Sequence, residues 1–125
     1  MHSKLTMAPF ALGLLGGLGS NKADPDAEVL RNLKKAGSDL SKPHKIEFFL
    51  YFHEPTLAHE AANRIETLGF ETHVRSAAQG PDWLCFAVRT MVPTLEGLQK
   101  IRGDFNALAA SLGGEYDGWG TGVVH

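Results

Sequence analysis

Two His-Glu pairs are the residues of this chain best suited to acid-base or metal chemistry: His53-Glu54 and His59-Glu60. His59 and Glu60 are adjacent in a predicted helix, so their side chains diverge, and His53 ends a predicted strand. Neither pair has the His-Glu-x-x-His spacing of zinc proteases. We therefore predict no catalytic residue, no metal site and no cofactor. Metal binding by His53, Glu54 and His59 stays open as a lesser alternative.

Cys85 is the only cysteine of the chain. A single cysteine excludes an internal disulfide and an all-cysteine metal site, and it favours a cytoplasmic protein only weakly. Cys85 falls in a predicted strand with no base beside it in sequence. Those features are typical of a small packing residue and not of a nucleophile.

The composition is that of one globular domain with little net charge. The chain has 125 residues, of which 43% are apolar. It has 14 acidic and 12 basic residues. One hydrophobic core suits this length. A strong non-specific nucleic-acid binder needs a basic surface to neutralise phosphates, and the near-neutral balance argues against that class.

The first 22 residues differ from the rest. The apolar run Met7–Leu18 is interrupted by Pro9 and three glycines, and it is too short to span a bilayer as a helix. We expect a flexible apolar leader over 1–22 and a single α+β domain over 23–125. An export signal or a tether is the alternative interpretation of the leader.

From Asp24 onward, turn and cap residues separate the elements clearly. Asp24 and Pro25 predict a helix start, and Gly37 predicts its stop. The expected elements that follow are a strand over 45–52, a helix from Pro55 to Gly69, strands over 70–74 and 82–89, a helix over 94–112 and a strand over 114–121. The order β-α-β-β-α-β predicts a ferredoxin-like sandwich with a four-stranded antiparallel sheet and an extra N-terminal helix.

Alternation along the strands assigns side chains to the two faces of this sheet. We expect Ile46, Phe48, Leu50 and Phe52 to meet the helices. In the strand over 82–89 we expect Leu84, Phe86 and Val88 to do the same. The side chains expected on the opposite face are Glu47, Phe49, Tyr51, Glu71, His73, Arg75, Trp83, Cys85, Ala87 and Arg89.

That helix-free face would carry an aromatic platform of Phe49, Tyr51 and Trp83, flanked by Arg75 and Arg89. It is too apolar for a solvated surface, so something is expected to cover it. The cover is the leader or the helix over 24–36, or a second copy or a protein partner. Single-stranded RNA stacked on the rings is a further possibility.

The last strand, Gly114–Thr121, places Trp119 between two glycines. One interpretation has its indole closing the core. The other has Trp119 held out for a partner beside Tyr116 and Asp117. As an edge strand, this segment is also suited to recruiting a peptide by strand addition.

The segment Glu115-Tyr116-Asp117-Gly118-Trp119-Gly120-Thr121 resembles the closing motif of the RraB family, regulators of ribonuclease E activity. Asp39-Leu40-Ser41-Lys42-Pro43, followed by Ile46–Phe52, resembles the start of that family's first strand. The resemblance covers about residues 24–124. It implies a ferredoxin-like fold that binds an endoribonuclease and lowers its activity without catalysis. The best-known members are strongly acidic and this chain is not, so the fold transfers more safely than the partner.

We therefore expect a non-enzymatic cytoplasmic regulator that binds a ribonuclease E-type endoribonuclease and inhibits RNA processing. The expected partner-binding residues are Phe49, Tyr51, Arg75, Trp83, Arg89, Tyr116, Asp117 and Trp119. A homodimer through the open sheet face is possible, and membrane association is not expected. The rival interpretation is an RNA- or ligand-binding module that uses the sheet face. An enzyme using the His53 region is a third.

Overall fold

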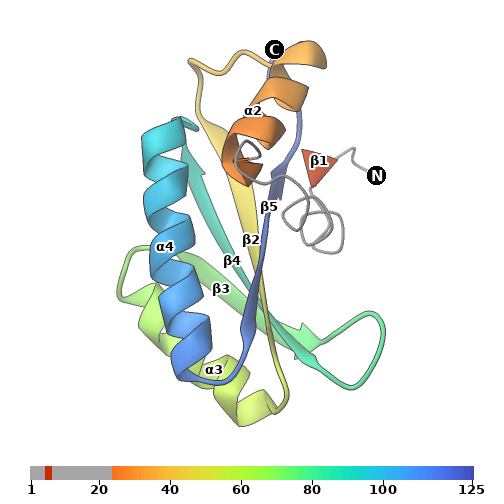
Figure 1. Cartoon of the computed structure of the whole chain (residues 1–125), viewed down its shortest axis with the longest axis vertical. Helices are drawn as coiled ribbons and strands as arrows, with labels where there is room; N and C mark the ends of the chain where they lie inside the picture. The colour runs from red at the N-terminus through yellow and green to blue at the C-terminus, as the bar shows by residue number, and fades with distance from the viewer. Residues whose placement is uncertain (1–4, 7–23) are drawn as a thin grey trace.

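The computed structural model describes residues 5–6 and 24–125 (Figure 1). Its elements are β1 (Leu5–Thr6), α2 (Pro25–Lys35), β2 (His44–Phe52), α3 (Pro55–Glu66), β3 (Glu71–Ser76), β4 (Trp83–Met91), α4 (Leu95–Ser111) and β5 (Glu115–Thr121). The leader predicted for 1–22 lies outside the described residues except at β1. Within the described ranges, no helix is long and apolar enough to cross a bilayer.

The five strands form one antiparallel sheet in the order β1-β5-β2-β4-β3. The four long strands have the ferredoxin-like arrangement, with β2 and β4 at the centre. This confirms the predicted α+β class and the predicted neighbours. The two-residue strand β1 adds to the free edge of β5, where Leu5 pairs with Thr121.

Strand β2 shows the alternation that its sequence predicts. Ile46, Phe48 and Leu50 are fully buried on the helix side, and the residues between them are not. The Phe48 ring meets the rings of Phe70 and Phe105 edge-on at 5.6 Å. This aromatic cluster is the centre of the core, because edge-to-face contacts are the favoured geometry of packed rings.

All three described helices pack on one face of the sheet. Val29 and Leu33 of α2 belong to the same buried cluster as Ile65 of α3 and Leu98 of α4. Figure 1 shows α2 beside α4, with the β3–β4 hairpin reaching away from them. The alternative in which the helix over 24–36 covers the opposite face is therefore wrong. Helix α2 extends the helix layer instead.

The orientation of strand β4 is the reverse of the prediction: the small side chains at its centre, Cys85 and Ala87, face the helices. Cys85 and Ala87 pair with the core residues Leu50 and Phe48, and both are 0% exposed. Directly paired residues share a face, so a shift of one residue exchanges the faces of the whole strand. The side chains of Leu84, Phe86 and Val88 therefore lie on the other face.

The helix above β4 explains this choice. Helix α3 contacts β4, and its buried side is made of Ala58, Ala61, Ala62 and Ile65. A helix with an alanine-rich face approaches a sheet closely, and only small side chains fit beneath it. Cys85 and Ala87 meet that steric requirement, whereas Phe86 does not.

Gly114 marks the close approach of β5 to the end of β2. A Cβ built there would collide with the Phe52 ring and with the carbonyl oxygen of Tyr51. The backbone oxygen cannot move aside without disturbing the strand pair, so the position requires glycine.

We predict that Gly114→Ala lowers the free energy of unfolding by about 2–3 kcal/mol through this overpacking. Gly103→Ala is the matched control, since nothing lies within 4 Å of a Cβ at that helical position. It should be neutral or stabilise by up to about 1 kcal/mol. Urea titrations of the two variants and the wild type measure both effects. Equal stability of the two variants would contradict the steric argument.

Candidate functional site

The side of the sheet away from the helices is the candidate site, and we call it the open face. No helix among residues 24–125 covers it. Phe49 and Phe86 pair across β2 and β4 and stack at its centre, with ring centroids 6.0 Å apart and planes 13° apart. The open face comprises Glu47, Phe49, Tyr51, Glu71, His73, Arg75, Leu84, Phe86, Val88 and Glu115.

Strand β3 adds cationic and imidazole groups to the aromatic centre. The Arg75 guanidinium lies 5.1 Å from the centroid of the Phe86 ring. The His73 ring lies 5.2 Å from the same ring, and its Nε2 is 3.0 Å from Oε2 of Glu71. Phe86 is thus stacked, flanked and held in place by three side chains, a rigid arrangement suited to an anchor residue.

Among the residues that the structure describes, this side of the sheet carries several carboxylates. Glu47, Glu71 and Glu115 belong to the open face, and Asp117 lies near Tyr51. Burial raises the pKa of Asp117 to about 7, and the nearby Glu115 carboxylate adds to that rise. Burial and Asp117 also raise the pKa of Tyr51, against the effect of Arg75. Two neighbouring carboxylates such as Asp117 and Glu115 repel each other when both are ionised, and a bound cationic group would relieve that repulsion.

The predicted platform is only partly assembled. Phe49, Tyr51 and Arg75 share the open face as expected, and the third ring is Phe86. Trp83 pairs with Phe52 instead and packs against the core on the helix side. Sequence reasoning missed Phe86, because β4 is apolar on both faces and alternation alone did not choose between them.

Arg89 also lies on the helix side. Its guanidinium rests 4.7 Å from the centroid of the Phe70 ring. It lines a cavity of about 530 Å³ between β4 and α4, together with Met91 and Lys100. The predicted position of Arg89 beside the aromatic platform is therefore wrong. The whole of β4 faces the opposite way from the prediction, so Arg89 lies on the helix side for the same reason as Trp83.

Trp119 is a core residue with 2% of its surface exposed. Its Nε1–H donates to Oδ1 of Asp26 at 2.9 Å. The alternative of a Trp held out for a partner is wrong. Tyr116 faces the helices as well, with its ring edge-on to Phe105 at 5.7 Å. Its hydroxyl finds no hydrogen-bond partner in the described part of the chain, and burial raises its pKa.

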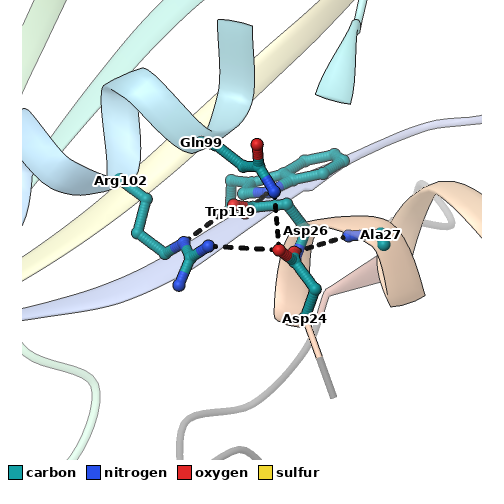
Figure 2. A network of polar contacts seen from close by, with 6 residues as sticks. All are labelled: Asp24, Asp26, Ala27, Gln99, Arg102 and Trp119. Carbon is teal, nitrogen blue, oxygen red and sulfur yellow. Dashed lines mark hydrogen bonds and ion pairs between the residues drawn. The ribbon is translucent and has the colours of Figure 1, made fainter. Parts of the chain in front are cut away.

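Asp26 joins three elements in one polar network (Figure 2). It accepts from Trp119 of β5 and, at 2.8 Å, from Nε of Arg102 in α4. Asp24 caps α2 by accepting from the N–H groups of Asp26 and Ala27, and Gln99 donates to it at 2.6 Å. Burial raises the pKa of Asp26, while Trp119 and Arg102 oppose that rise. The network fixes α2 to the helix layer.

The family model described as "Regulator of ribonuclease activity B" (RraB) matches residues 23–121. The chain belongs to the RraB family. This confirms the resemblance inferred from Glu115–Thr121, which falls inside the matched range. No curated protein shows significant similarity to the chain.

The RraB family is described as a regulator of ribonuclease activity. Cys85 is buried, and burial followed by the Glu66 charge raises the pKa of its thiol to about 12. His53 is 76% exposed, with Nδ1 3.1 Å from Oδ1 of Asp82. In the described ranges, no three His, Cys, Asp or Glu side chains gather in a way that could hold a metal ion.

A buried Ser-His pair that sequence reasoning missed also has a structural role. The Ser38 hydroxyl donates to Nε2 of His44 at 2.6 Å, and Nδ1–H of His44 donates to the Lys42 carbonyl at 2.8 Å. The N–H of Val124 donates to Oγ of Ser38 at 2.9 Å. His44 is fully buried, and the pair ties the C-terminal segment to the start of β2.

We predict that Asp26→Ala costs about 3 kcal/mol of unfolding free energy, because it leaves the buried Trp119 N–H without its acceptor and removes the nearer of the two carboxylates that pair with Arg102. Asp104→Ala is the control. It removes an exposed ion pair with Lys100 and should cost about 0.5 kcal/mol or less. Urea unfolding followed by tryptophan fluorescence reports both changes. An Asp26→Ala protein as stable as the control would show that the network is not structural.

Asp117 should make stability depend on pH. Its folded-state pKa of about 7 exceeds the ordinary value of 3.8, so its ionisation opposes folding. The resulting loss of folding stability is absent below about pH 4, grows as the pH rises and is complete above about pH 7. We predict that Asp117→Asn stabilises the protein by about 1 kcal/mol at pH 8, after discounting for solvent screening, and changes little at pH 4. Denaturant titrations at the two pH values measure this, and a variant that is less stable at pH 8 contradicts it.

Proposed function

We propose that this RraB-family protein inhibits RNA processing by binding an endoribonuclease of the ribonuclease E type, with the open face as its docking surface. Family membership supports the regulation of a ribonuclease. The observation that supports the surface is the stacked pair Phe49–Phe86 with Arg75 beside it on a sheet face free of described helices. Aromatic and Arg side chains are the groups that dominate the energy of protein interfaces.

The chemistry of the open face supports inhibition by occlusion. Its carboxylates and aromatic rings suit binding, and no group there has an activated base beside a nucleophile. Regulation by docking needs only shape and charge complementarity with the ribonuclease. We infer that the bound regulator blocks or repositions a region of the enzyme and takes no part in bond cleavage.

Charge favours a protein partner over RNA. Stacked aromatics with an adjacent arginine would also receive unpaired bases. RNA binding, however, requires cations to neutralise phosphates, and among the described residues this face offers one arginine and one histidine beside the carboxylates of Glu71, Glu115 and Asp117. A phosphate backbone would be repelled. A basic and apolar segment of a protein fits the same surface, with its apolar groups on the rings and its cations at the carboxylates.

We predict that Phe49→Ala and Tyr51→Ala each weaken binding to a purified ribonuclease E-type enzyme at least about tenfold, because interface aromatics carry most of the binding energy. Leu68→Ala is the matched control. Leu68 is 52% exposed, but it lies in the turn between α3 and β3 and not on the open face. Biolayer interferometry gives the affinities, and cleavage of a fluorogenic RNA gives the inhibition. If Leu68→Ala weakened binding as much as the other two changes, the open face would not be the docking surface.

A pull-down from host lysate separates the regulator from the RNA-binding alternative. Recovery of the endoribonuclease after the RNA has been digested supports direct protein contact. Loss of the endoribonuclease upon digestion would overturn it, since an RNA bridge would then hold the two proteins together.

Trp83→Ala is expected to lower thermal stability and to leave the affinity of the folded fraction unchanged, because Trp83 packs against the core.

A further inference from the structure

Strand β3 is an outer strand of the sheet and has a free edge. It pairs with β4 on one side, and no described strand pairs with the other. The opposite edge of the sheet is different, since β1 pairs with Thr121 and Gly120 of β5. Unpaired N–H and C=O groups along a strand are a template for another strand, and native proteins either block such edges or use them.

The side chains of β3 are complementary to themselves when the strand is reversed. Glu71, His73 and Arg75 share the open face, with the acid at one end, the base at the other and the imidazole between them. In an antiparallel pair that is two-fold symmetric about His73, Glu71 of each copy lies opposite Arg75 of the other, and Thr72 lies opposite Val74.

Neighbouring registers lose this match. Symmetry about Val74 places His73 opposite Arg75 of the second copy, two groups that do not attract each other. Symmetry about Thr72 places Glu71 opposite His73, which attract each other strongly only when the imidazole is protonated, and it leaves Arg75 opposite Gly69, outside the strand. Charge therefore selects the register centred on His73. The exposure of Glu71 (68%) and His73 (50%) leaves both side chains free to rearrange across the edge.

We infer that β3 is a self-association edge, at which two copies of this chain pair antiparallel about His73. A two-fold axis perpendicular to the sheet keeps both open faces on one side. The dimer would then carry two aromatic centres on a continuous surface. Two linked sites raise the effective affinity for a partner with repeated binding segments. Self-pairing at β3 does not depend on the proposed function, and no ribonuclease is needed to detect it.

Charge reversal tests the pairing. Sedimentation velocity of the full chain over a concentration series should show a wild-type dimer that dissociates on dilution. Glu71→Arg alone and Arg75→Glu alone each place like charges opposite one another twice. Each should raise the dimer dissociation constant at least about tenfold. The double variant Glu71→Arg/Arg75→Glu restores opposite charges, and its dissociation constant should return to within about threefold of the wild-type value.

The double variant Glu60→Arg/Arg64→Glu is the matched control. It swaps an exposed ion pair within α3 and should leave self-association unchanged. Circular dichroism confirms that each variant is folded. A chain that is monomeric at every concentration overturns the inference, and so does a dimer that is indifferent to the single reversals. A dimer lost in Phe49→Ala, but not in either reversal, would place the interface on the open face and overturn it equally.

Discussion

The hydrogen bond between Trp119 and Asp26 joins the last strand to α2 and helps to hold α2 on the helix side of the sheet. The indole fills the helix side of β5, and its buried N–H requires an acceptor. Asp26 supplies that acceptor from α2, and Arg102 of α4 compensates its charge. Because this bond holds α2 in the helix layer, α2 does not cross the opposite face. The half-buried stack of Phe49 and Phe86 therefore has no described helix above it.

A β-bulge in the glycine-rich final strand determines which of its side chains point to each face of the sheet. Register with β2 shifts between Phe48 and Leu50, and Gly118 adopts a φ of +99°. A bulge adds one residue to a strand, so Tyr116 and Trp119 both point toward the helices although three positions separate them. Asp117 is left beside Tyr51 at the open face. Glycine at 118 is needed because a side chain at this φ would be strained.

The parts of the fold that could be predicted from the sequence are those governed by local rules. Asp24 before Pro25 predicts a helix start, and the alternation from Ile46 to Phe52 predicts a half-buried strand. Strand β4 could not be oriented in this way, because both of its faces are apolar and the choice depends on the space beneath α3. The acceptor for Trp119 lies 93 residues earlier in the chain, and no local pattern indicates such a contact.

The net charge of the chain conceals how its charges are distributed. A balance of −2 suggests no preference for a partner. The fold, however, places Arg89 and Arg102 on the helix side, where an aromatic ring and two aspartates engage them. The carboxylates of β2, β3 and β5 stay with the aromatic rings on the opposite side. In the proposed function, a partner meets the charge of one face and not that of the whole chain, so the net charge of the chain is a poor guide to its partner.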